Sequence, residues 1–273
     1  MALTIVTTYC LCVDLLVAIC HREDPQCQMT DAQIMTTAIV AALYFGGNYE
    51  SARHFLKEHG YIPNMLSKSR FCRRLHRIRP MFESLFSQLA EVFKALNTQS
   101  IYIIDTYPVA VCDNIRISTS KLYTSEVYRG YQVSKKRYFY GIKVHLLVTT
   151  TGEPVEFFFT PGSVGDVEGL WIYQFDIPTD SVVYADKAYN DYRVEDALAE
   201  AGIKLKPIRK KNLLRQFPPW VEYIQQYYRK RIETTNSQIS RLLPKSIHAV
   251  TPEGFQLKVF LFILATSINC LSI

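Results

Sequence analysis

The sequence lacks paired cysteines and clustered histidines. Its seven cysteines are an odd number, lie scattered along the chain and form no CxxC pair. The pattern therefore indicates neither a disulfide framework nor a zinc site, and a reducing cytoplasm fits it best. An uninterrupted apolar run is also missing, because Asp14 interrupts the apolar opening and Lys258 the apolar stretch near the end. We expect a buried terminal helix there and no signal peptide or membrane span.

Acidic residues are scarce between Lys204 and Lys245. This segment holds eleven basic residues against two acids, an excess larger than the +6 of the whole chain. The composition is otherwise that of a folded globular protein, with 48% hydrophobic and 21% charged residues. A concentrated basic segment on such a chain favours an anionic partner.

The first 96 residues predict helices and no strands. Apolar residues recur at helical spacing, and Thr30 and Asp31 can cap a helix that Gly46 and Gly47 end. We expect this all-α region to form a separate domain, residues 1–96, in front of a second domain, residues 97–273.

Residues 51–80 predict a short helix, a turn, and a second, basic helix from about Ser67 to Pro80. This arrangement suggests a DNA-binding helix-turn-helix. A solvated charged face is the alternative, but no acid is present on this face to pair with the cations. The arginines that share one face of the basic helix by three-and-four spacing are Arg70, Arg73, Arg74 and Arg77.

From residue 101 the periodicity changes to that of strands. Strands are expected at 101–109, 138–149, 153–162, 181–186 and 203–208, and helices at 165–173, 192–202 and 220–243. The order β β β α β α β α predicts an α/β fold, with a mixed five-stranded sheet and flanking helices.

Three acids stand out by position. Asp105 interrupts the first strand, Asp186 ends the fourth, and Glu233 lies in the last basic helix. Since the first and fourth strands are expected to pair, the three carboxylates would converge and repel one another unless cations shared the site. Two divalent ions bound by these carboxylate oxygens would remove the repulsion. The pattern therefore predicts Mg²⁺, with Mn²⁺ as a substitute, and cleavage of phosphodiesters.

Each acid also has an ordinary explanation. Asp105 could cap a turn, Asp186 could cap the helix that begins near Asp191, and Glu233 could form an ion pair with Arg229 at i, i−4 spacing. The combined pattern favours the metal site. His145 and Lys143 alternate on one strand and could face this site, while a packed, hydrogen-bonded His145 is equally compatible with the sequence.

Five ordered blocks carry a resemblance: "IDTYPVAVCDNIRI", "YRGYQVSKKRYFYGIKVHLLVT", "VEFFFTPGS", "YADKAY" and "PIRKKN". With them the chain resembles the DDE transposases of bacterial insertion sequences, most closely the insertion sequence nine-eighty-two family. The resemblance implies a ribonuclease-H-like catalytic domain with Asp105, Asp186 and Glu233 as the catalytic, metal-binding triad. It also implies double-stranded DNA as partner, namely terminal inverted repeats and target DNA, and a homo-oligomeric synaptic complex without any membrane association.

Several further cations are interpreted as DNA contacts beside the triad: Lys187, Lys210, Lys211, Arg229 and Arg241. Tyr189 is a second candidate for holding a phosphate. The chain departs from the family pattern at three positions, where Gln226 replaces a tyrosine, Ser240 a lysine and Gly165 a histidine. Two alternative functions stay open: a nuclease or resolvase without strand transfer, and an inactive copy that only binds DNA.

The segment 128–140 interleaves tyrosines with cations. Such a mixture suits unpaired or distorted DNA, and a hairpin packed on the sheet is the alternative. The residues concerned are Tyr128, Tyr131, Tyr138 and Tyr140 with Arg129, Lys135, Lys136 and Arg137.

Overall fold

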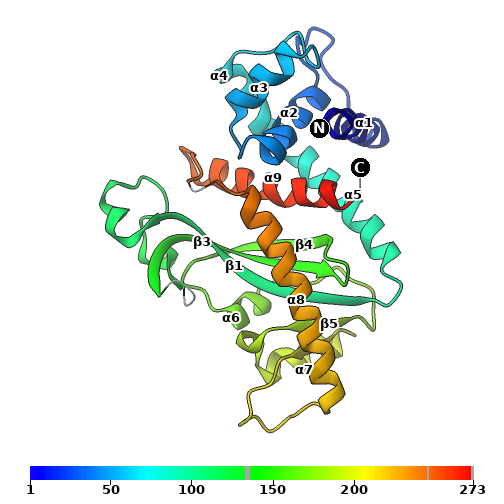
Figure 1. The fold of residues 1–273 in the computed structure, drawn as a ribbon, viewed down its shortest axis with the longest axis vertical. Helices are drawn as coiled ribbons and strands as arrows, with labels where there is room; N and C mark the ends of the chain where they lie inside the picture. The colour runs from blue at the N-terminus through cyan, green and yellow to red at the C-terminus, as the bar shows by residue number, and fades with distance from the viewer. Residues whose placement is uncertain (133–135, 245, 272–273) are drawn as a thin grey trace. The chain divides into compact units, whose positions relative to one another are not determined.

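The computed structural model describes residues 1–132, 136–244 and 246–271, so Lys135 lies outside the described residues. The chain divides into two compact units, one made of 1–89 and 238–273, the other of 90–237 (Figure 1). The C-terminal segment thus packs with the N-terminal helices, although it is distant in sequence. The functions assigned to 1–96 and 97–273 remain predictions.

The first unit is helical, as the sequence predicts. Its helices are α1 (Ala2–Ala18), α2 (Asp31–Tyr44), α3 (Tyr49–Glu58), α4 (Lys68–Arg77) and α9 (Pro252–Cys270), while α5 (Arg79–Leu96) runs across the division between the units. A capping box between Thr30 and Gln33 starts α2, and Gly46 and Gly47 follow its end with positive φ, as expected. Helix α2 is buried against α1, α3, α4 and α9.

The apolar C-terminal stretch forms the buried helix α9, which confirms the expectation. Its side chains from Val259 to Ile268 are all buried, and Lys258 directs its ammonium to the carbonyl of His248 at 2.6 Å. Among the described residues, no helix has the length and apolar character needed to cross a membrane.

The second unit is built on a mixed six-stranded sheet. Its strands are β1 (Ile101–Asp113), β2 (Arg129–Gln132), β3 (Arg137–Thr149), β4 (Pro154–Pro161), β5 (Val182–Ala185) and β6 (Lys204–Pro207). Strand β1 is central, antiparallel to β3 and parallel to β5, with β6 parallel to β5 beyond it. Both β4 and the short β2 pair with β3, at different stretches of it.

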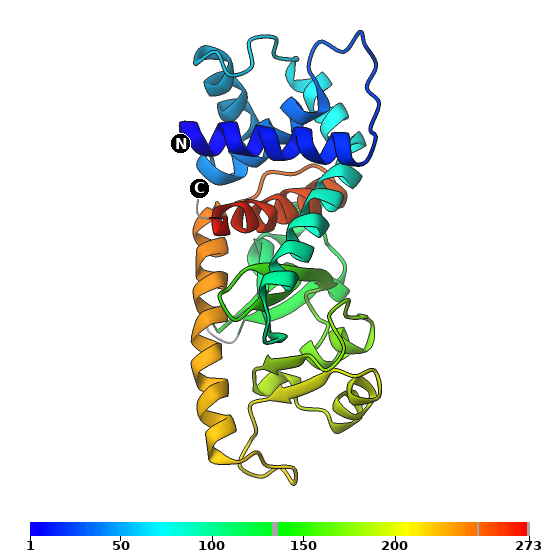
Figure 2. The same cartoon turned by 90° about the vertical axis from the view of Figure 1, so that its right-hand side faces the viewer.

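Helices lie on both faces of this sheet. In Figures 1 and 2, α8 (Pro219–Leu242) runs along one face, and α7 (Tyr192–Glu200) lies on the other. The short α6 (Asp166–Trp171) follows β4. The predicted α/β class, a mixed sheet with flanking helices, is confirmed, with β2 as an additional short strand beside the five predicted ones. The strand β2 was not among the predicted strands because its four residues, "RGYQ", show no apolar alternation. Its antiparallel pairing with the start of β3 is the alternative that the sequence offered for 128–140, a hairpin packed on the sheet.

Candidate active site

The pairing of strand β1 with strand β5 brings Asp105 and Asp186 together. The parallel pairing of β1 with β5 ends at Ile104 opposite Ala185; Asp105 is the next residue of β1, and Asp186 directly follows the end of β5. Neighbouring strands lie about 4.8 Å apart, so the two carboxylates leave the sheet side by side. Ile104 and Ala185 are buried, whereas the chain behind Asp186 turns into a short 3-10 helix (Lys187–Tyr189). The sequence signal, an acid directly after a buried run, located this position correctly.

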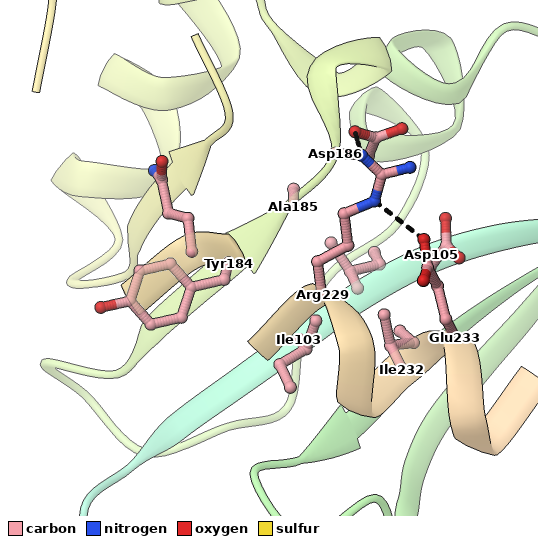
Figure 3. A pocket seen from close by; sticks show the side chains of 10 residues that line it. Ile103, Asp105, Tyr184, Ala185, Asp186, Arg229, Ile232 and Glu233 are labelled. Atoms are coloured by element: carbon pink, nitrogen blue, oxygen red, sulfur yellow. Dashed lines mark hydrogen bonds and ion pairs between the residues drawn. The ribbon is translucent and has the colours of Figure 1, made fainter. Parts of the chain in front are cut away.

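Helix α8 adds Glu233 to the same place. Asp105, Asp186 and Glu233 all line one pocket, together with Arg229 and with the apolar side chains of Ile103 and Ile232 (Figure 3). Ile232 is buried and Glu233 exposed, because α8 presents one face to the sheet and turns its neighbouring face toward the aspartates. The three acids that the sequence singled out are therefore brought together by three different elements.

Arg229 reaches between the acids (Figure 3). Its Nε donates to Oε1 of Glu233 at 2.9 Å, and its Nη1 lies 3.7 Å from Oδ1 of Asp186. The i, i+4 ion pair offered as the ordinary explanation of Glu233 therefore exists, and it exists inside the pocket. Arg229 offsets part of the negative charge there.

Asn236, about one turn beyond Glu233 on α8, forms a hydrogen bond to Asp105. Its Nδ2 donates to Oδ2 of Asp105 at 2.8 Å, while its own Oδ1 is buried without a hydrogen-bond partner among the described residues. Sequence reasoning missed Asn236. The available signal was its spacing, since residues three apart on a helix lie on one face, so a side chain three after Glu233 points toward the same pocket.

The crowding of carboxylates is visible in the acid-base behaviour of Asp105. Burial, the largest cause, and the nearby charges of Asp186, Asp166 and Glu233 together raise the pKa of this carboxyl to about 6, against a backbone hydrogen bond from Thr106 that lowers it. The shift thus reflects the burial of Asp105 first and the neighbouring carboxylates second. Asp166 was not among the predicted acids of the site; its carboxylate lies 3.3 Å from Nζ of Lys143, which also donates to the carbonyl of Val164 at 2.7 Å.

A buried polar chain lies behind Asp105. Oγ1 of Thr106 bonds both Nδ1 of His145, at 2.9 Å, and the hydroxyl of Tyr189, and Nε2 of His145 bonds Oγ1 of Thr160 at 3.0 Å. His145 is fully buried and stacks on Phe158, and burial lowers its pKa to about 3. The packed alternative for His145 is the one that the structure shows.

The same chain corrects the interpretation of Tyr189. Its side chain is 1% exposed and its hydroxyl is used by Thr106, so it cannot hold a DNA phosphate. The sequence suggested that Tyr189 faces solvent beside Asp186, at the end of β5. In the structure the 3-10 turn after Asp186 folds the ring back into the core, and a turn of that kind is not visible in strand alternation.

The other cations that are predicted to bind DNA are exposed. Lys187 follows Asp186 directly, and Lys210 and Lys211 lie in the loop after β6. Arg241, near the end of α8, is exposed as well. Lys187, Lys210, Lys211 and Arg241 make no ion pair with an acid in the part of the chain that is described, and their role as DNA contacts stays a prediction.

Arg74 differs from the other arginines of α4. Arg70, Arg73 and Arg77 are exposed, and the opposite side chains of Phe71, Leu75 and Ile78 are buried, as predicted. The guanidinium of Arg74 instead donates to the carboxylate of Asp31 and to the carbonyl of Met29. The sequence indicated that this face had no acidic partner. Asp31 supplies one from α2, which removes Arg74 from the surface available to DNA.

The pair formed by Asp31 and Arg74 belongs to a small cluster. His21, Glu23 and Asp31 bring potential ligand atoms within 4.8 Å of one another. Nε2 of His21 lies 2.9 Å from Oδ2 of Asp31, and Glu23 accepts from the Asp31 backbone at 2.6 Å. These groups satisfy one another and tie the start of α2 in place, so we do not treat them as a metal site.

Comparison with known proteins agrees with this geometry. A family model described as a transposase DDE domain matches residues 95–248, more than half of the chain and all of the pocket. The chain belongs to the DDE transposase family. No curated protein matches it. Among solved structures it is similar to the piggyBac transposase in a cryo-EM structure of the synaptic complex with hairpin DNA, with 10% identity and a TM-score of 0.45. That similarity covers 96% of this chain and 64% of the piggyBac chain.

DDE transposase domains use divalent metal ions in general, and the pocket of this family member suits them. All donors from Asp105, Asp186 and Glu233 are carboxylate oxygens, the ligands that Mg²⁺ and Mn²⁺ prefer. Oδ1 of Asp186 is buried and has no hydrogen-bond partner among the described residues, and its ion pair with Arg229 is long, at 3.7 Å, so it keeps the capacity to bind a metal ion.

Proposed function

We propose that this chain is the transposase of an insertion sequence, of the nine-eighty-two family, that binds the terminal inverted repeats and catalyses metal-dependent DNA cleavage and strand transfer. The observation that carries the proposal is the pocket in which Asp105, Asp186 and Glu233 meet. Membership of the DDE transposase family supports the same activity. The proposed working form is a homo-oligomer that holds two DNA ends.

Each acid has a role in this proposal. Asp105 and Asp186, which lie side by side on paired strands, would hold divalent ions from the sheet, and Glu233 would hold them from α8. Bound there, Mg²⁺ ions supply an activated attacking oxygen and stabilise the leaving oxygen of the phosphodiester. Asn236 keeps the Asp105 carboxylate oriented, and Arg229 places a positive charge where a DNA phosphate would enter.

The basic surfaces supply the DNA contacts. Arg70, Arg73 and Arg77 of α4 are proposed to bind the terminal repeats, and Lys187, Lys210 and Lys211 the backbone near the pocket. Such contacts release counterions, so binding weakens steeply with added salt. A salt-independent affinity would argue against DNA as the partner.

The decisive experiment is a plasmid assay with DNA that ends in the inverted repeats, pre-cleaved at the 3′ ends. The wild-type protein with Mg²⁺ is expected to join these ends to the plasmid, and Asp186→Ala to bind the ends without joining them. Glu200→Ala, which removes an exposed acid at the end of α7 outside the pocket, serves as a matched control that keeps all three acids of the site.

Three results would count against the proposal. Cleavage of uncut ends without any joined product would identify a nuclease or resolvase. Equal absence of metal-dependent cleavage in the wild type and in Asp186→Ala, with end binding retained, would identify an inactive DNA-binding copy. Joining by Asp186→Ala at the wild-type rate would exclude this pocket as the active site.

A further inference from the structure

Helix α8 carries exposed aromatic rings on the side away from the sheet. Trp220, Tyr223 and Tyr227 are 63%, 73% and 51% exposed. They follow one another at i, i+3 and i+7, which places all three on one helix face. Single exposed aromatics are ordinary, whereas three large rings in a row on one face mark a surface that binds something. We call these residues the α8 aromatic face.

This face is distinct from the two other faces of α8. Val221, Gln225 and Ile232 point into the core, and Arg229, Glu233 and Asn236 face the carboxylate pocket. The aromatic face therefore neither enters the core nor holds the acids.

Two cations follow the three rings on the same side of α8. Lys230 and Arg231 are exposed, and within the described residues neither forms an ion pair with an acid. The guanidinium of Arg231 lies 5.9 Å from the ring centroid of Tyr227, within cation–π range. An apolar protein partner would be poorly matched to these charges, whereas a partner that combines flat rings with negative charge matches both.

One ring is already held in place. Tyr227 packs edge-on against Tyr228 with centroids 5.4 Å apart, and Tyr228 stacks on Tyr184 of β5 at 5.2 Å. A ring fixed in this way loses little conformational freedom when a second ring stacks on it. Tyr227 is thus anchored to the strand that ends in Asp186.

We propose that the α8 aromatic face binds unpaired DNA, with the bases stacked on Trp220, Tyr223 and Tyr227 and the phosphates near Lys230 and Arg231. Stacked bases inside a duplex have no free ring surface, so the rings select a single strand or an opened end. The face spans about 10 Å along the helix. The inference rests on the proposed function, because it names the form of DNA taken up beside the same active site.

The test measures binding without cleavage. The full chain is titrated in EDTA against a fluorescein-labelled oligothymidylate of about twelve nucleotides and against a duplex of equal length, with fluorescence anisotropy as the readout. Tyr223→Ala/Tyr227→Ala is expected to lose at least about tenfold in affinity for the single strand, and less than about twofold for the duplex. Tyr223→Phe/Tyr227→Phe, which keeps both rings, is the matched control and should bind both as the wild type does.

A second measurement locates the strand directly. Trp171 and Trp220 are the two tryptophans of the chain, so Trp171→Phe leaves Trp220 as the only indole. Its fluorescence should fall when oligothymidylate is added and change little with the duplex. An unchanged signal would contradict stacking on Trp220.

Other outcomes overturn the inference in distinguishable ways. Equal losses on single strand and duplex, or no loss on either, would show that the rings do not select unpaired bases. If the alanine variant binds DNA normally but changes from dimer to monomer in light scattering, the face is an interface between copies of the chain. Because binding is measured in EDTA, it does not require catalysis, and Asp186→Ala should bind oligothymidylate as the wild type does. If the strand-transfer assay fails, the proposed function is refuted, while the binding of single-stranded DNA by the α8 aromatic face still stands.

Discussion

Asn236→Ala tests whether the hydrogen bond from Asn236 of α8 orients the Asp105 carboxylate for metal binding. The substitution removes the 2.8 Å hydrogen bond from Nδ2 to the Asp105 carboxylate, and leaves no other partner stranded, because Oδ1 of Asn236 bonds no group among the described residues. A hydrogen bond to a charged group contributes about 1.5–3 kcal/mol, which corresponds to about a ten- to hundredfold change in an equilibrium constant. Residues that orient metal ligands have effects of about this size on metal affinity.

The assay is single-turnover cleavage of a labelled end substrate over a range of Mg²⁺ concentrations. The variant should need at least about tenfold more Mg²⁺ for half-maximal rate, with a smaller loss of rate at saturation. Ser237→Ala changes the exposed neighbour on the same helix and should behave as the wild type. If Asn236→Ala shows the wild-type Mg²⁺ dependence, the hydrogen bond does not position Asp105 for metal binding, and the role assigned to Asn236 is wrong.

Three further predictions follow from the contacts described above. Arg74→Ala should lower the free energy of unfolding, measured by urea denaturation, by about 3 kcal/mol, because it leaves the buried Asp31 carboxylate without the Arg74 guanidinium. Arg73→Ala should leave the free energy of unfolding unchanged and reduce the salt slope of DNA binding by about one. The reverse pattern would refute the distinction between the two arginines. The pKa of His145 in the folded protein, about 3, lies below its value in the unfolded chain, so its contribution to stability is present above about pH 6.5 and is lost as the pH falls toward 3. Between pH 6 and 4.5 the free energy of unfolding of the wild type should fall about 1 kcal/mol per pH unit more steeply than that of His145→Gln. Parallel slopes would exclude a buried neutral imidazole. The raised pKa of Asp105 acts with the opposite sign but is common to both proteins, so it cancels in this comparison. Lys210→Ala/Lys211→Ala should weaken binding of all DNA sequences alike and lower the salt slope by about two, as measured by anisotropy, and an unchanged slope would remove these lysines from the interface.

The sequence located the acids because their positions depend on local pattern and strand order. Asp105 and Asp186 each interrupt or follow an apolar strand, and parallel pairing of those strands is the only further step needed to bring them together. What the sequence could not supply were contacts between distant segments. Asp31 and Arg74 are separated by 43 residues, and no periodicity relates them. The inward turn of Tyr189 likewise depends on the position of Thr106, on another strand.

Glu233 shows how an ordinary contact and a functional one can coincide. From sequence, the i, i+4 pair with Arg229 and a role beside the aspartates were competing explanations, since an ion pair on a helix surface needs no active site. The structure contains the pair, yet the guanidinium that forms it also lies 3.7 Å from Asp186. The same four-residue spacing that stabilises an isolated helix therefore places Arg229 over two of the acids that α8 and β5 bring together. Because mutual repulsion of the carboxylates opposes this convergence, a cation supplied by the helix itself lowers its cost before any metal or DNA is bound. An ion pair at this position is thus part of the site, and its presence does not count against a catalytic role for Glu233.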